Sequence, residues 1–493
     1  MFRRFEKLLD PYPAEAPKNP PRGFFAFVWA CSEGARPAIV AMTIFTAMIG
    51  AFEALLFSML GHVVDWLAKV QPSQLWSEER GNLMLLAGIL IASPLLIALQ
   101  NLFKHQTLAG NLPMRLRWNF HRWMLGQSMS FYQDEFAGRI AAKVMQTALA
   151  AREVVLILCD ILVFVVIYFV TMTAVVGTFD SWLLLPFVCW LSAYVVALWW
   201  FVPRMGKVAK DQADARSLMT GRVTDAYTNI ATVKLFSHAQ REAGFARSAM
   251  MEFMVTAYRQ MRLATAWEVV NHILNVLLII GTTGTTLWLW SRGQLGVGAV
   301  AAATAMALRL NGISHWVMWE MASLFEHVGT VQDGVTTLAR PHAVVDRADA
   351  VPIEVRHGEI RFEDVSFAYG ASGPHATQVI DRLNLHIRPG EKIGLVGRSG
   401  AGKSTITNLL LRFYDTAQGR ILIDGQDISH ATQDSLRAQI GMVTQDTSLR
   451  TARCATTSCT AGPIRTTRRW SRRRAGPKPV SYTHLTLPTI YSV

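Results

Sequence analysis

The sequence predicts two parts: an all-α polytopic membrane domain of six transmembrane helices with long cytoplasmic extensions, followed by an α/β domain. Hydrophobic residues make up 51% of the 493 residues and charged residues only 17%, whereas an ordinary soluble protein has about 25% charged residues. Long uncharged runs fill the first two thirds of the chain, and a strand, a glycine-rich turn and a helix follow later. This composition excludes an intrinsically disordered chain and an ordinary cytosolic enzyme.

Residues 1–36 are polar, proline-rich and basic, and they are expected to form an N-terminal segment outside the membrane. Six apolar segments follow, each long enough as a helix to cross the roughly 30 Å hydrocarbon core of a bilayer. They are Pro37–Val64, Gly81–Phe103, Val154–Val176, Ser181–Pro203, Val269–Ser291 and Gln294–Phe325. We therefore expect a transmembrane domain over residues 37–340.

The connections between these segments alternate in length. The two long ones, Lys104–Glu153 and Arg204–Glu268, carry seven and ten Lys or Arg against three and six acidic residues. Basic connections stay in the cytoplasm, so both are predicted to be cytoplasmic, and six crossings then place both termini there too. Within them, Lys207–Ala226 and Gln240–Ala266 are free of proline and rich in helix-favouring residues. We expect them to continue the spans as helices, with separate amphipathic surface helices as the alternative.

Four ionisable residues, Glu53, Asp160, Arg309 and Glu320, fall within the apolar segments. Charged side chains are costly there and usually face an interior cavity or one another. Structural pairing is one interpretation, and substrate contact or proton coupling is the other.

After Pro341 the pattern changes to short alternating segments typical of strands. The expected strands are Ile353–Val365, Val379–Ile387, Lys392–Val396, Arg420–Ile423 and Ile440–Val443, and Lys403–Phe413 is the expected helix. Strands and a helix in this order predict an α/β domain of the P-loop type.

A glycine-rich loop lies between the expected strand Lys392–Val396 and this helix. It matches G-x-x-x-x-G-K-[S/T] in full, with the residues Gly397, Arg398, Ser399, Gly400, Ala401, Gly402, Lys403 and Ser404. Such a loop points backbone N–H groups at phosphate oxygens, and the helix N-terminus adds partial positive charge. Lys403 would reach the β- and γ-phosphates, and the Ser404 hydroxyl would ligate Mg²⁺. Arg398 and Ser399 are expected simply to be exposed.

Two further residues could contact the same phosphate-containing ligand or its Mg²⁺. Tyr369 precedes the loop by about 28 residues, and its ring could stack on adenine, a contact of about 1–3 kcal/mol by analogy with base stacking. Gln445 follows the apolar segment Ile440–Val443 and could contact Mg²⁺ or its water. A core tyrosine and an ordinary loop glutamine are the alternatives.

Together these residues resemble the ABC transporter family, specifically its exporter-type half-transporters, which are multidrug or lipid exporter-like. In this resemblance Tyr369 lies at the A-loop aromatic position, Gly397–Thr405 at the Walker A motif and Gln445 at the Q-loop. Asp424–Ile428 matches the D-G-x-D-I hairpin that precedes the Q-loop. The similarity covers about residues 23–449.

The membrane part carries further similarities to the family. Asp225–Glu242 looks like the second coupling helix, and Pro113–Met124 lies where the first would be. Ser130-Phe131-Tyr132 and Gly138-Arg139-Ile140 are similar to the S-F-F…G pattern that follows it.

The resemblance implies an exporter half in the inner membrane that pairs with a second half-transporter, most simply another copy of itself. It implies ATP and Mg²⁺ as cofactors, with Lys403 and Gln445 as catalytic residues and Ser404 and Gln445 at the metal. The bilayer and an unidentified exported substrate are the other expected partners. The alternatives are an ATP-sensing membrane regulator on the same fold and a membrane-anchored P-loop kinase or GTPase. The latter would be supported by an N-K-x-D motif, and the sequence contains none.

The sequence departs from the family after Gln445. It contains no L-S-G-G-Q signature, no Walker B Asp followed by a catalytic Glu, and no switch His there. Residues 341–449 are therefore predicted to be the N-terminal part of the ATP-binding domain, truncated after the Q-loop. Because the missing residues would orient the attacking water, this chain is predicted to lack ATPase activity.

Residues 450–493 contain eight Arg, one Lys and no acidic residue, and so account for most of the net charge of +13. Plausible codons after Leu449, read in a shifted frame, give HRSVRDNI and then LYGRPDPDD. This text is similar to the S-V-x-x-N-I-x-Y-G segment of exporters. Ser481–Thr489 looks like translated sequencing-library adapter. We therefore predict a frameshifted, non-native tail rather than an arginine-rich nucleic-acid arm, and no nucleic-acid partner.

Overall fold

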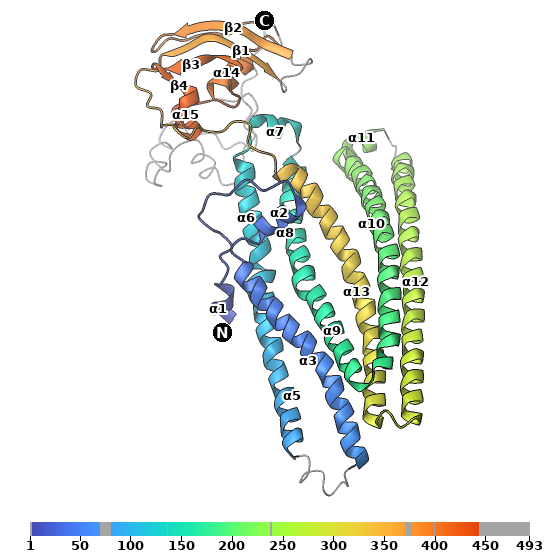
Figure 1. Ribbon diagram of the computed structural model, residues 1–493. Coiled ribbons are helices and arrows are strands. Elements are labelled where there is room, and N and C mark those ends of the chain that lie inside the picture. Colours follow the sequence, from blue (N-terminus) through green and yellow to red (C-terminus); the bar gives the residue numbers. More distant parts are fainter. Residues whose placement is uncertain are drawn as a thin grey trace, which may run out of the picture. The chain divides into compact units, whose positions relative to one another are not determined.

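The computed structural model describes residues 2–69, 80–135, 137–236, 239–369, 377–398 and 400–442. Ser399, Gln445 and the tail 450–493 therefore lie outside the described residues. The chain divides into two compact units (Figure 1). The membrane unit holds Met1–Gly126 and Glu135–Pro341, and the nucleotide unit holds Gln127–Asp134 together with the chain from His342 onward.

In its described part the membrane unit contains helices and no strands. Six helical stretches are long and apolar enough to cross a membrane, and they confirm the six predicted spans. They are Arg36–Leu67, Arg80–Leu125, Gly138–Phe179, Ser181–Thr228, Gln240–Ser291 and Val297–Leu338. The individual elements are α2 (Phe24–Cys31), α3 (Arg36–Lys69), α5 (Arg80–Asn101), η1 (Leu102–Ala109), α6 (Asn111–Leu125), α8 (Ala137–Leu156), η2 (Ile157–Ile161), α9 (Leu162–Phe179), η3 (Ser181–Leu183), α10 (Leu184–Thr228), α12 (Ala239–Ser291) and α13 (Val297–Leu338).

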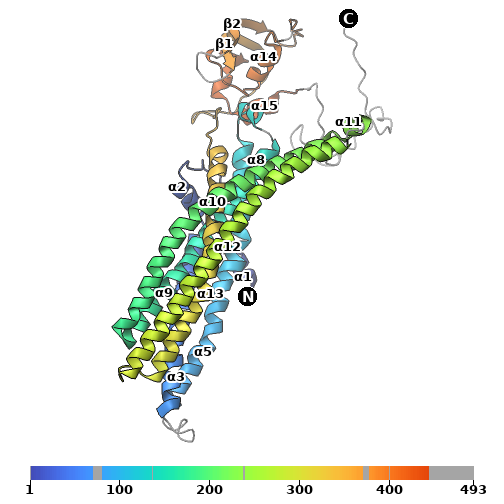
Figure 2. The same cartoon turned by 90° about the vertical axis from the view of Figure 1, so that its right-hand side faces the viewer.

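The predicted continuation of two spans is confirmed. Helices α10 and α12 run unbroken for 45 and 53 residues, so the alternative of separate surface helices is wrong. Figure 2 shows the two helices side by side along their length, joined by the short helix α11 (Ile230–Leu235). In both helices the polar half continues the apolar half without a break, because helix-favouring residues lie where the two halves meet. Pro203 is accommodated inside α10.

Aromatic side chains pack between α10 and α12. The rings of Trp190 and Tyr194 stack at 4.9 Å, and Trp267 meets Tyr194 and Phe201 edge-on at 5.7 and 5.4 Å. Trp267 is only 1% exposed. Such pairs contribute roughly 0.5–1.5 kcal/mol each beyond their buried area, so they hold the long helices together where the surrounding bilayer gives no hydrophobic drive to associate.

Helix α13 crosses α8 at a point where only glycine fits. A Cβ atom built on Gly334 would overlap the side chain of Thr147 on α8. Both residues are buried, and Thr147 is 1% exposed. Small residues allow this close backbone approach, as they commonly do between membrane helices.

An N-terminal segment, which includes α1 (Phe2–Glu6), lies along η1 and α6. Side chains that follow one another on a single helical face donate hydrogen bonds to its backbone carbonyl groups at 2.7–3.3 Å. The donors are Thr107, Asn111, Arg115, Trp118 and Arg122, and the acceptors are Phe5, Glu6, Asp10, Pro13, Ala14 and Glu15. This row of bonds fixes the end of α1 and residues 7–15, which form no regular structure.

The nucleotide unit contains a four-stranded antiparallel sheet in the order β2-β1-β3-β4. The strands are β1 (Ile360–Tyr369), β2 (Thr377–Ile387), β3 (Gln418–Ile423) and β4 (Gln426–Asp427), and the helices are α7 (Met129–Asp134), α14 (Lys403–Leu410), η4 (Ile428–His430) and α15 (Gln433–Gln439). Phe362, Val365, Leu409 and Ile421 are buried in its core. Alternation correctly predicts β2 and β3, and the predicted helix Lys403–Phe413 is confirmed except that it ends at Leu410.

Two predicted strands are wrong, and a third begins late. Residues 392–396 and 440–442 are not strands, and the strand expected from Ile353 begins at Ile360. A strand persists only where a neighbour satisfies its N–H and C=O groups, and within the described ranges no segment pairs with 392–396. Val396 is accordingly 98% exposed.

Asp424 organises the turn between β3 and β4 together with the segment before β1. Its Oδ2 accepts hydrogen bonds from the N–H groups of Arg356, His357 and Gly358 at 2.7, 2.8 and 3.2 Å, and its Oδ1 accepts one from Glu359 at 2.8 Å. These backbone donors, His357 first among them, hold the pKa of the Asp424 carboxyl well below its ordinary value.

Replacing Asp424 with Asn is expected to lower the unfolding temperature of the nucleotide unit. Asn keeps the shape and the positive φ of 48° but loses the charge that the four donors stabilise. A carboxyl group whose pKa is lower in the folded state than in the unfolded state stabilises the fold. This stabilisation is complete above the unfolded-state pKa of about 3.9 and is lost as the pH falls through the folded-state pKa. The difference in unfolding temperature between the variant and the wild type should thus be constant between about pH 5 and 8 and shrink below about pH 4.

Thermal unfolding of the full chain in detergent, followed across this pH range, measures the effect. Asp381→Asn is the matched control, because the Asp381 side chain is 63% exposed. Equal unfolding temperatures for the two variants at pH 7 would contradict the role given to Asp424.

Candidate nucleotide-binding site

The glycine-rich loop enters α14 through two residues in the left-handed region. Gly400 and Gly402 have φ values of +85° and +83°, which side chains with a Cβ adopt only with strain. Gly402 directly precedes the first residue of the helix, Lys403. The first N–H groups of a helix have no partner within it, so this end can receive the oxygens of an anion.

Lys403 folds back over the loop. Its Nζ donates to the carbonyl oxygens of Gly397 and Arg398 at 2.8 and 2.9 Å. The ammonium group is therefore held above the loop by neutral acceptors, which a phosphate could replace with a stronger, charge-assisted partner. Ser404 follows in the first turn and is exposed, as a metal-ligating hydroxyl requires.

Tyr369 ends β1 beside this helix. Its hydroxyl lies 3.2 Å from Oγ1 of Thr405, which is 5% exposed. The Tyr369 ring meets Phe367 and Tyr414 edge-on at 4.9 and 5.2 Å. The structure thus brings Tyr369 to the helix that begins at the loop, and Thr405 serves as its hydrogen-bonding partner.

Of the remaining predicted site residues, two lie in the glycine-rich loop itself and two fall outside the described residues. Gly397 and Ala401 lie in the loop, where a Cβ on Gly397 would come within 3.2 Å of the Cβ of Ala401. Ser399 and Gln445 fall outside the described residues. The described residues therefore bring together the glycine-rich loop, the start of α14 and one aromatic side chain.

The sequence pattern missed one element of this unit. Helix α7 belongs to the nucleotide unit, and the Tyr414 hydroxyl donates to Oε1 of Gln133 at 2.7 Å. The segment Pro113–Met124, expected at the first coupling position, instead lies inside α6, where Leu112, Leu116 and Phe120 are buried. The available signal was Ser130-Phe131-Tyr132, which lies within α7 itself.

The chain belongs to the ABC transporter family. The family model described as ABC transporter transmembrane region matches residues 39–313, and the one described as ABC transporter matches residues 380–476. The second match extends beyond Leu449, and the origin assigned to the tail stays a prediction. The six spans and the glycine-rich loop agree with an exporter-type half-transporter.

Among its relatives, an uncharacterized ABC transporter ATP-binding protein of Haemophilus influenzae is 53% identical over 91% of this chain and 72% of its own length. An ATM1-type heavy metal exporter of Novosphingobium aromaticivorans is 32% identical over 46% of this chain and 37% of its own length. A solved structure of a bacterial Atm1-family ABC exporter with ATP bound has a TM-score of 0.68 and 24% identity, covering 84% of this chain and 72% of that one. The last comparison supports the fold.

Proposed function

We propose that this chain is half of an ATP-driven exporter that couples ATP binding and hydrolysis to movement of a substrate across the inner membrane. The observation that carries the proposal is a six-span unit joined in one chain to a phosphate loop whose lysine lies above the N-terminus of α14. ATP closure of two nucleotide units would switch the membrane cavity from inward to outward facing.

ATP with Mg²⁺ is the proposed cofactor. Tyr369 would stack on adenine, Gly397–Thr405 would bind the phosphates, and Ser404 with Gln445 would hold the metal. The electrostatic contribution of Mg²⁺ is to neutralise charge on the β- and γ-phosphates. Lys403 would release the two loop carbonyls and donate to phosphate oxygens instead.

A second copy of this chain is the simplest partner. In the proposed dimer each ATP would lie between the phosphate loop of one subunit and the signature segment of the other. The chain contains no such segment after Gln445, so we propose that 341–449 is the N-terminal part of the ATP-binding domain and 450–493 a non-native tail. The 493-residue polypeptide would then be inactive as an ATPase.

Helix α11 is the proposed docking element for the nucleotide unit. Ile230, Leu235 and Phe236 are 44%, 77% and 61% exposed at the end of the long pair α10 and α12. Exposed apolar side chains at a helix end commonly mark an interaction surface. This assignment requires α11 to be cytoplasmic, as the charge of Arg204–Glu268 predicts.

The topology predicts which positions an impermeant thiol reagent reaches in intact cells. In a background whose five cysteines are replaced by alanine, Ile230→Cys should react only after permeabilisation, because it lies in the basic, cytoplasmic connection. Arg292→Cys, in the exposed turn between α12 and α13, is the matched control and should react from outside. Ready labelling of position 230 in intact cells would overturn the topology.

Transport by a version with the reading frame restored after Leu449 tests the function itself. Reconstituted in vesicles, it should move fluorescent amphipathic probes in an ATP-dependent manner, and Lys403→Ala should not. Nucleotide-dependent structural change without movement of any probe would favour the ATP-sensing regulator.

A further inference from the structure

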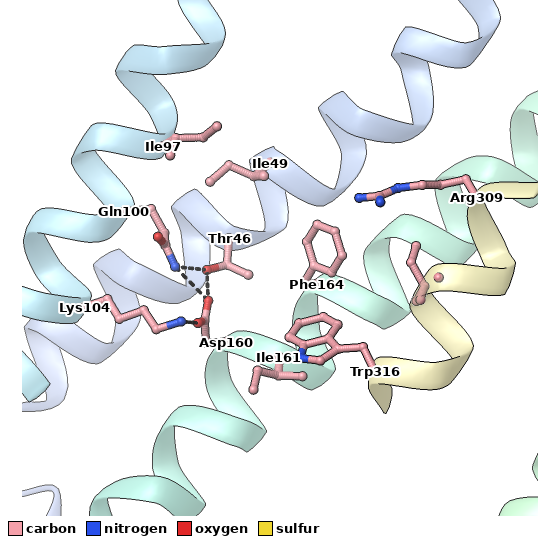
Figure 3. A pocket seen from close by; sticks show the side chains of 12 residues that line it. Thr46, Ile49, Ile97, Gln100, Lys104, Asp160, Ile161, Phe164, Arg309 and Trp316 are labelled. Carbon is pink, nitrogen blue, oxygen red and sulfur yellow. Dashed lines mark hydrogen bonds and ion pairs between the residues drawn. The ribbon is translucent and has the colours of Figure 1, made fainter. Parts of the chain in front are cut away.

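A cavity of about 410 Å³ lies within the membrane unit, between α3, α5, η1, η2, α9 and α13 (Figure 3). Its volume is within the range of about 300–1,000 Å³ typical of small-molecule sites. Ile49, Ile97, Phe164 and Trp316 give it apolar walls. Polar groups gather at one end, and Arg309 projects in from α13 on another side (Figure 3).

The polar end is built around Asp160. Its Oδ1 accepts hydrogen bonds from the Thr46 hydroxyl and from Nε2 of Gln100, the latter at 2.9 Å, and its Oδ2 lies 2.7 Å from Nζ of Lys104. Lys104 lies in the π-helical segment η1 and Asp160 in the π-helical segment η2. Such segments are rare and occur frequently at functional sites.

A second ion pair lies at the same cavity. NH2 of Arg309 is 2.8 Å from Oε2 of Glu53. Structural pairing thus accounts for three of the four charged residues in the apolar segments, and Glu320 accepts a bond from Nε1 of Trp316 at 3.0 Å. Neither pair is fully buried, and partly exposed ion pairs contribute little to stability, so stability alone does not explain why the cations of both pairs line one cavity.

In both ion pairs the cationic side chain is more exposed than the anionic side chain. The Lys104 side chain is 29% exposed against 7% for Asp160, and that of Arg309 is 43% exposed against 32% for Glu53. Lys104 and Arg309 both line the cavity, whereas Glu53 is not among its lining residues. Each cation has more N–H donors than its partner occupies, so the cavity offers donors next to aromatic and aliphatic walls.

We propose that this cavity binds a small amphipathic acid, whose carboxylate, sulfonate or phosphate group contacts Arg309. Its apolar portion lies against Phe164, Trp316 and the isoleucines. The inference deepens the proposed function, on which it rests, by assigning the class of substrate that the membrane unit takes.

Equilibrium binding of tritiated 4-phenylbutyrate to the purified 493-residue chain in lipid nanodiscs tests the assignment. Unlabelled 4-phenylbutyrate should compete at least about tenfold better than the neutral 4-phenylbutyramide or the cationic 4-phenylbutylamine. Of the three, only the carboxylate can accept a charge-assisted hydrogen bond from a cationic side chain of the cavity. Equal competition by all three would show partition into an apolar space, and a preference for the amine would assign the site to cations through Asp160. Either result overturns the proposal.

Variants of the second ion pair give effects of opposite sign. Arg309→Gln should weaken acid binding about tenfold or more, whereas Glu53→Gln should strengthen it by freeing the guanidinium. A purely structural pair would predict loss of binding in both. The double variant Glu53→Gln with Arg309→Gln leaves no unpaired charge, and retention of wild-type acid affinity by this folded variant would also overturn the proposal. These measurements need no ATP, so failure of transport with intact acid selectivity would count against the exporter function alone.

Discussion

The 493-residue polypeptide is expected to bind ATP and to hydrolyse it at least about a hundredfold more slowly than a version with the frame restored after Leu449. In the proposed site, the loop, Lys403 and the N-terminus of α14 would receive the phosphates, and the structure places the Lys403 ammonium on the loop at the start of α14. Phosphoryl transfer depends mainly on positioning and electrostatics, and the sequence after Gln445 contains no residue set that would orient the attacking water.

The comparison uses both proteins in the same detergent, with phosphate release and binding of a fluorescent ATP analogue as separate measurements. Lys403→Ala is expected to weaken nucleotide binding in the short form and to abolish turnover in the restored form, because it removes the cation at the phosphates. Lys403-dependent turnover by the short form near the restored rate would mean that the catalytic residues lie elsewhere in the chain.

Gly334→Ala is expected to destabilise the membrane unit by about 3 kcal/mol or more, at the upper end of the cost of overpacking. The added methyl group would overlap Thr147 on α8, and neither helix can withdraw without losing the buried contacts around it. Helix propensity works in the opposite direction, since alanine favours a helix over glycine by about 1 kcal/mol.

Gly329→Ala is the matched control on the same helix. Gly329 is exposed, and a Cβ there meets no atom within 4 Å, so this change should leave the unfolding temperature unchanged or raise it. Thermal unfolding of both variants in detergent, monitored by size-exclusion fluorescence, separates the steric effect at the crossing of α8 and α13 from the effect of helix propensity. Equal stability of the two variants would show that α8 and α13 do not approach so closely.

The membrane unit was predictable because its signals are local. The length of each apolar run specifies a span, and the absence of proline in Gln240–Ala266 correctly predicts that α12 continues. The strand Lys392–Val396 was predicted wrongly because strand formation depends on a partner segment that local alternation cannot specify. The pair Lys104 and Asp160 also had no sequence signal, because it forms between π-helical segments of different spans.

Within the candidate site, the motif alone indicated where the backbone takes up the left-handed conformation, at Gly400 and Gly402; that the loop binds phosphate stays a prediction. The contact between Tyr369 and Thr405 depended on how β1 packs against α14 and could not be predicted from spacing. The same holds for α7, whose place in the nucleotide unit depends on a tertiary contact with Tyr414.

The N-terminal segment has a consequence for how the protein is made. Phe5 and the Thr107 side chain that binds its carbonyl are 102 residues apart, which at a usual translation rate is a delay of about 5–20 s. During this delay the accepting carbonyl groups of the segment lack these side-chain partners, because the helical face that supplies them has not been synthesised. Docking of the segment therefore reports that the second transmembrane helix has emerged and folded, and its protection from protease during translation would time that event.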